Sequence, residues 1–177
     1  MPWIPIPGGG GSFYISNVGG ATSRGVELEV TARAAGGVDV FGSFGYTRAR
    51  FSDGSTSTGA DVSDNKVPFT PDYTGSLGIQ LSRNVRQNLL AFGRAELVCR
   101  GSFRYDDANT QGQDAYTLMN LRAGVEIRKF TLEGWIRNAF DTRYIPTAFG
   151  YPGLAPSGFV GEVGAPRTFG ISVGVRF

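Results

Sequence analysis

Histidine is absent from this 177-residue chain, cysteine occurs once, and no apolar run is long enough for a transmembrane helix. Without histidine the chain lacks the commonest general base. A single cysteine, Cys99, excludes an intramolecular disulfide and a zinc site built from cysteines. A membrane-spanning helix would need an apolar run of about 18 residues or more. These absences leave open a protein that crosses a membrane with strands, because alternating strands give only weak hydropathy.

Charge is also scarce, at 18% of residues, and nearly balanced, with 17 basic and 15 acidic side chains. The basic residues are scattered along the sequence, so they form no footprint for nucleic acid. Glycine is abundant, at 27 residues, and aromatic residues make up 12% of the chain. We therefore expect no nucleic-acid partner, and nothing in the composition indicates a cofactor.

The final stretch, Pro166 to Phe177, alternates from Thr168 onward between small or polar residues and apolar ones. Its apolar members are Phe169, Ile171, Val173, Val175 and Phe177. Successive side chains of a strand point to opposite faces, so one face of this strand is wholly apolar. The chain also ends on an aromatic residue at the apolar register, which is unusual for a solvated terminus and is explained if that face meets lipid.

Other segments repeat this pattern, and none shows a helical period. The predicted strands are Ser12–Asn17, Gly25–Ala34, Val38–Phe51, Tyr73–Ser82, Gln87–Tyr105, Ala115–Ile127, Phe130–Asn138 and the final stretch. Tight turns at 35–37, 84–86 and 128–129 alternate with long loops, which is typical of an outer-membrane barrel. The pattern predicts an all-β, antiparallel transmembrane β-barrel of about eight strands, with both termini on the side of the tight turns.

Charged residues fall on the polar register of these strands. They are Glu27, Glu29, Arg33, Arg94, Glu96, Arg122, Glu126, Glu133, Arg137 and Arg176. An arginine facing lipid near the membrane midplane costs roughly 2–4 kcal/mol, so we expect these acids and arginines to pair inside the lumen. The alternative is a soluble β-sandwich binding module whose charged face meets water.

The first residues, 1–11, are rich in proline and glycine and predict a flexible segment or linker before a barrel domain at 12–177. They lack the basic region and continuous apolar segment of an export signal. Export to an outer membrane therefore requires a signal that is not visible in this sequence.

Three stretches, taken in order, resemble the C-terminal barrel of TonB-dependent outer-membrane receptors. They are NVGGATSRGVELE at 17–29, NAFDTRY at 138–144 and GAPRTFGISVGVRF at 164–177. A further segment, VPFTPDYTGSLG at 67–78, is also similar. In the second stretch Ala139 stands where the family usually has leucine. The resemblance implies a location in the outer membrane of a Gram-negative bacterium, with membrane lipid as a partner.

The family carries a barrel of about 22 strands with a plug domain and a TonB-box peptide, and it imports siderophores and other nutrients. Neither plug nor TonB box is visible here, so we expect a chain that is not an active transporter alone. The resemblance also implies that the terminal Phe177 is recognised by the barrel-assembly machinery. The alternative is a small stand-alone structural or adhesive outer-membrane barrel.

If the chain is part of a full receptor, its long loops would contribute to an external surface for a siderophore or other nutrient. Aromatic residues in the last loop, Tyr144, Phe149, Tyr151 and Phe159, would then stack on that ligand, or else pack the loop itself. No nucleophile and base are clustered as catalysis requires, so we expect no enzyme activity. The aspartates of the loops lack the spacing of a calcium-binding loop, so we expect no metal site.

Overall fold

A computed structural model describes residues 3–5, 13–15, 17–151, 153, 155 and 157–176. Seven long antiparallel strands form one continuous sheet, in the order β15-β12-β11-β8-β7-β4-β3. The strands are β3 (Ala21–Ala34), β4 (Val38–Phe51), β7 (Tyr73–Arg86), β8 (Leu89–Arg100), β11 (Tyr116–Ile127), β12 (Phe130–Arg137) and β15 (Thr168–Val175). The described residues form no helix long and apolar enough to cross a membrane.

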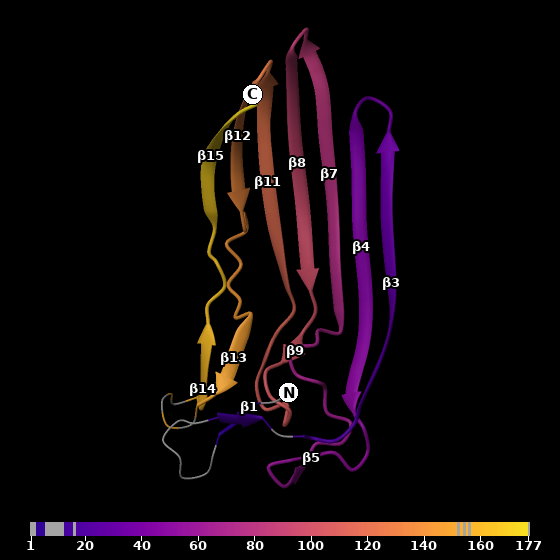
Figure 1. The fold of residues 1–177 in the computed structure, drawn as a ribbon, viewed down its shortest axis with the longest axis vertical. Helices are drawn as coiled ribbons and strands as arrows, with labels where there is room; N and C mark the ends of the chain where they lie inside the picture. Colours follow the sequence, from indigo (N-terminus) through magenta and orange to yellow (C-terminus); the bar gives the residue numbers. More distant parts are fainter. Residues whose placement is uncertain are drawn as a thin grey trace.

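Tight turns join the strands at one end of the sheet, and long loops join them at the other (Figure 1). Short strand pairs give the loops their own structure. They are β5 (Thr56–Ser57) with β6 (Ala60–Asp61), β9 (Phe103–Arg104) with β10 (Gly112–Gln113), and β13 (Thr147–Gly150) with β14 (Phe159–Glu162). The asymmetry between tight turns and long loops is therefore as the sequence predicts.

Strand register places the alternating apolar sets of the seven strands on one face, although Phe41 and a few other apolar residues lie on the polar face. Val26 lies opposite Tyr46 in β3 and β4, and Ile136 lies opposite Phe169 in β12 and β15. Because the side-chain period of a strand is two, this register aligns every apolar set with its neighbour. Within the described residues no second layer covers the face, and Val26 and Phe169 are 69% and 78% exposed.

The prediction of a closed eight-stranded barrel is not confirmed, because the described sheet has seven strands and is open. Within the described part of the expected first strand, Ser12–Asn17, lies β2 (Phe13–Ile15), which pairs with β1 (Trp3–Pro5) in a separate hairpin. With seven strands, β3 starts at the loop end and the C-terminus lies at the turn end (Figure 1). The expectation that both termini lie on the side of the turns is therefore wrong.

Several strand boundaries also differ from the prediction, and β3, for example, begins at Ala21 and not at Gly25. The predicted strand Gln87–Tyr105 divides at Gly101, whose backbone N–H donates to Tyr73 O at 2.8 Å. A side chain at Gly101 would lie 2.9 Å from the backbone nitrogen of Tyr73, so this close approach needs glycine. β7 runs on to Arg86, with an irregularity in its pairing between Asn84 and Arg86, so the second turn follows at 87–88.

Buried side chains gather among the loops, not on the sheet. Phe103 is 1% exposed and packs with Tyr105 and Ala148, with Tyr116 and Phe159 against them. Val62, in the loop between β4 and β7, is also 1% exposed. The loop end therefore has a core of its own, whereas the strands leave both faces of the sheet accessible.

Candidate functional site

The polar face of the sheet carries the predicted charge network. The register sets Glu29 opposite Ser43, Glu96 opposite both Gly78 and Asn120, and Arg122 opposite both Arg94 and Trp135. All ten predicted residues share the polar alternation, with Arg176 following directly after β15. The sequence therefore identified which face carries the charges.

Pairing within this network is local. Of the predicted residues, Arg94 and Glu96 form an ion pair at 3.1 Å, and Arg94 also stacks on Phe41 at 3.9 Å. Arg33 pairs with Asp39, a residue that the prediction did not include. Within the described part of the chain the other predicted members form no ion pair, so mutual neutralisation across the face remains a prediction.

A concavity of about 300 Å³ lies on the polar face across β8, β11, β12 and β15. Its polar lining consists of Arg94, Glu96, Asn120, Arg122, Glu133, Trp135, Arg137 and Ser172. Three arginines face two glutamates there, and Arg137 lies over the Trp135 ring at 5.1 Å. Guanidinium groups bind carboxylates and other planar anions in bidentate fashion. The concavity is thus suited to an anionic or aromatic group.

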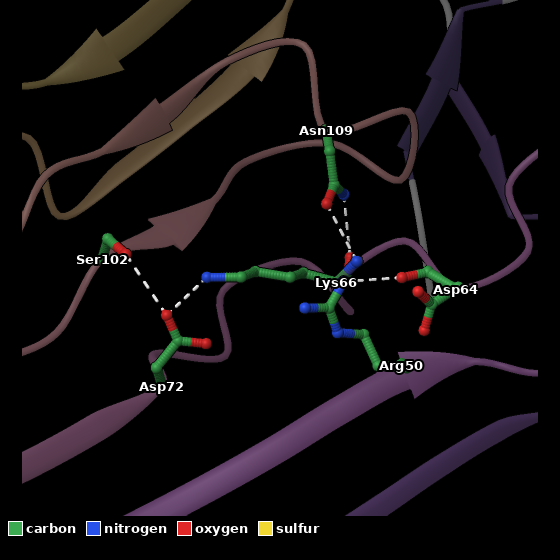
Figure 2. Close-up of polar contacts among 6 residues, drawn as sticks. All are labelled: Arg50, Asp64, Lys66, Asp72, Ser102 and Asn109. Atoms are coloured by element: carbon green, nitrogen blue, oxygen red, sulfur yellow. Dashed lines mark hydrogen bonds and ion pairs between the residues drawn. The ribbon is translucent and has the colours of Figure 1, made fainter.

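At the loop end, hydrogen bonds join the loop at 52–72 to the loop at 101–115 (Figure 2). Asn109 Oδ1 accepts from the Lys66 backbone N–H at 2.8 Å, and Asn109 Nδ2 donates to Lys66 O at 2.9 Å. Lys66 Nζ and Ser102 Oγ both donate to Asp72 Oδ2. Arg50 Nη1 donates to Asp64 O, which fixes the first loop to the end of β4. These hydrogen bonds therefore join the two loops into one unit.

The buried aromatic cluster connects this unit to the last loop. Tyr105 meets Phe103 edge-on at 5.6 Å, and its hydroxyl donates to Ile145 O at 2.8 Å. Burial raises the pKa of the Tyr105 phenol, because the charged form is disfavoured in the cluster. The Ile145 N–H donates to Gln113 Oε1, which adds a second link. Sequence reasoning missed these residues because their partners are distant in the chain.

The four aromatic residues predicted to bind ligand have different surroundings. Tyr144 stacks on Tyr116 at 4.5 Å, and Phe159 packs against the buried cluster. Phe149 is 41% exposed in β13, and Tyr151 follows that strand, half-buried. Tyr144 and Phe159 thus have packing roles in the loop, and ligand contact by any of the four remains a prediction.

Two of the family-like stretches meet at the base of the last loop. Asn138 is buried, its Oδ1 accepts from the Thr142 N–H, and its Nδ2 donates to Ala165 O. Asp141 Oδ1 accepts from the Arg167 N–H at 2.9 Å. The Tyr144 ring covers Gly164, where a Cβ would lie 2.3 Å from the ring. Asn138 and Asp141 thus hold the base of the last loop through hydrogen bonds from their side chains to backbone groups.

The remaining predictions concern a metal and the chain terminus. Asp106 caps its own loop by accepting hydrogen bonds from Thr110 and Gln111. Among the residues that the structure describes, no three acidic or sulfur-bearing side chains gather as a metal site would need. Phe177, predicted as an assembly signal, and most of the predicted flexible segment 1–11 lie outside the described residues.

Comparisons with known proteins agree with this arrangement. Residues 3–139 match the family described as TonB dependent receptor-like, beta-barrel. The ferrichrome outer membrane transporter/phage receptor of Escherichia coli K12 is 27% identical over 151 residues, which are 78% of this chain and 19% of that protein. The pesticin receptor of Yersinia pestis is 28% identical over 92% of this chain and 23% of its own length.

Solved structures that superpose on this chain are also receptors. The ferric yersiniabactin uptake receptor FyuA from Yersinia pestis superposes with a TM-score of 0.78 and 25% identity, over 89% of this chain and 24% of that one. The ferric preacinetobactin receptor BauA from Acinetobacter baumannii, at 21% identity, shares the fold with a TM-score of 0.72 over 93% of this chain and 23% of its own.

The chain thus spans about a fifth to a quarter of the relatives it matches. These relatives are described as receptors and transporters. The predicted receptor-barrel resemblance and the Gram-negative outer-membrane location are confirmed at the level of the family. The chain belongs to the TonB-dependent receptor-like β-barrel family.

Proposed function

We propose that this chain is one part of the barrel of an outer-membrane receptor that takes up ferric siderophores. Relatives named for ferrichrome, yersiniabactin and preacinetobactin support a siderophore as the ligand class. The observation that carries the proposal is the open seven-stranded sheet, with one continuous apolar face and one charged face.

Strand direction favours a portion of a larger barrel over a small barrel made from this chain alone. Every neighbouring pair in the sheet is antiparallel. With seven strands, the edge strands β3 and β15 run in the same direction, so joining them would need a parallel pair. Bacterial single-chain barrels have an even number of antiparallel strands. Further strands, odd in number, would complete an antiparallel barrel.

The apolar face has the dimensions of a lipid-facing band. Along β3 it extends from Val26 to Ala34, which at ~3.4 Å per residue is roughly 27 Å along the strand. A tilted transmembrane β-strand needs ~9–11 residues to cross the hydrocarbon core, and Val26 to Ala34 is nine residues. A β-sandwich would bury this face against a second sheet, and no such layer covers it in the described chain. We therefore assign membrane lipid as the partner of the apolar face.

The polar face and the joined loops are the proposed ligand side. In this view the concavity beside Arg122, Trp135 and Arg137 faces the lumen, and β13–β14 carries Phe149 toward the exterior. Aromatic rings and arginines suit a chelate with aromatic or anionic groups. We expect quenching of tryptophan fluorescence by a ferric siderophore, and a weaker effect after Arg137→Gln.

The size of the native protein tests whether the chain is a portion or stands alone. An antibody raised against this chain should detect, in outer-membrane fractions of the source bacterium, a protein about four times its 18.9 kDa mass. A band at 18.9 kDa in that fraction would favour the stand-alone structural or adhesive barrel. Detection only in the soluble fraction would contradict both.

A further inference from the structure

Two arginines lie directly opposite each other on the apolar register at the loop end of β3 and β4. Arg24 pairs with Arg48, one step beyond the pair formed by Val26 and Tyr46. Both side chains are exposed. Directly opposed residues have Cβ atoms ~4.5–5.5 Å apart, and like charges in such a pair destabilise the sheet. The pair therefore calls for a compensating anion.

The described part of the chain supplies no such anion. Its ion pairs are Arg33–Asp39, Lys66–Asp72 and Arg94–Glu96, so neither Arg24 nor Arg48 has an acidic partner there. Arg50, next on the same register of β4, donates to Asp64 O (Figure 2). Arg50 is thus fixed within the protein, whereas Arg24 and Arg48 present their guanidinium groups outward.

Position along the strands indicates where the anion would lie. Tyr46 lies opposite Tyr73, and this aromatic pair ends the apolar band on the loop side. Aromatic side chains are enriched at the level of lipid headgroups. Arg24 and Arg48 are the next residues outward on the same face, and the proposed lipid exposure of that face would set them at the depth of the headgroup phosphates. Long basic side chains at this boundary extend toward the interface.

The strand pairing holds the two arginines together. A Cβ at Gly25 would lie 2.3 Å from Tyr46 O, so β3 and β4 approach more closely there than a side chain would allow. We propose that Arg24 and Arg48 form a paired-arginine site for the phosphate of an anionic lipid headgroup in the leaflet on the loop side. Planar guanidinium groups bind phosphate oxygens in bidentate pairs. The inference rests on the proposed lipid exposure of the apolar face.

The test compares lipid retention by the chain in detergent, measured by native mass spectrometry with phosphatidylglycerol and phosphatidylcholine supplied in equal amounts. The chain should retain phosphatidylglycerol preferentially. The double substitution Arg24→Gln/Arg48→Gln should reduce this preference by at least roughly tenfold, because it removes both charge-assisted contacts to the phosphate. Arg83→Gln/Arg86→Gln, at the turn end, removes the same charge and should leave the preference within about twofold.

The site would be overturned if the Arg24/Arg48 variant kept the full preference for phosphatidylglycerol. It would also be overturned if the Arg83/Arg86 variant lost that preference to the same extent. Adding inorganic phosphate alone distinguishes a site for free phosphate from a site for the phosphate of a lipid headgroup. If it binds through Arg24 and Arg48 while phosphatidylglycerol shows no preference, the lipid assignment is wrong. Flotation with vesicles separates this inference from the proposed function. A chain that does not float contradicts lipid exposure itself, and one that floats without lipid preference contradicts only the site.

Discussion

At the scale of single residues, Asn138 holds the base of the last loop. Its backbone φ is +49°, a conformation that asparagine tolerates better than most residues, and its side chain bonds Thr142 and Ala165. Asn138→Ala would remove these hydrogen bonds to partly exposed backbone groups, at about 0.5–1.5 kcal/mol each. Faster amide hydrogen exchange at Thr142 should report the loss. Asn84→Ala, in an exposed position, should leave that exchange unchanged, and an Asn138 variant equally unaffected would refute the role.

Tyr105 makes the stability of the loops depend on pH. Because its folded pKa is raised, the neutral phenol contributes stability that is complete below the ordinary pKa of about 10 and is lost as the pH rises through the folded value. A pH titration followed by phenolate absorbance should contain a component above the ordinary tyrosine pKa, and this component should disappear in Tyr105→Phe. If that substitution removes only a component with an ordinary pKa, the hydroxyl is not buried as described.

At the scale of elements, the strands follow from local sequence and the loops do not. The prediction of Val38–Phe51 matches β4 residue for residue, because alternation and flanking glycines specify a strand locally. Charge partners were harder to predict, since register decides that Arg33 meets Asp39. Asn109 and Lys66 are 43 residues apart, and no local sequence pattern predicts their contact.

The contact between the two loops can be weakened at Asn109. Its φ of +58° favours asparagine or glycine, so Asn109→Gly removes the side-chain bonds without adding backbone strain. We expect amide exchange at Lys66 to rise by roughly tenfold, as the loss of about 1–1.5 kcal/mol would produce. Asn109→Ala adds strain and should raise it further. Unchanged exchange in both variants would mean that the loops are held together elsewhere.

At the scale of the whole molecule, sequence alone predicted the family and the two faces but not the closure. Counting Ser12–Asn17 as a barrel strand gave an even number of strands, whereas its described residues Phe13–Ile15 pair with Trp3–Pro5. A short strand run does not specify its partner, because backbone hydrogen bonds carry no sequence information. The open edges β3 and β15, and the parallel sense in which they run, emerge only from the assembled sheet.

Neighbouring residues of β3 can report which face of the sheet meets lipid and which meets water. In a Cys99→Ser background, Leu28→Cys and Glu29→Cys place a fluorescent label on opposite faces of one strand. In phospholipid vesicles, brominated lipid should quench the label at position 28, and aqueous iodide should quench the label at position 29. Equal quenching at both positions, or the reverse pattern, would contradict the lipid-facing assignment of the apolar face.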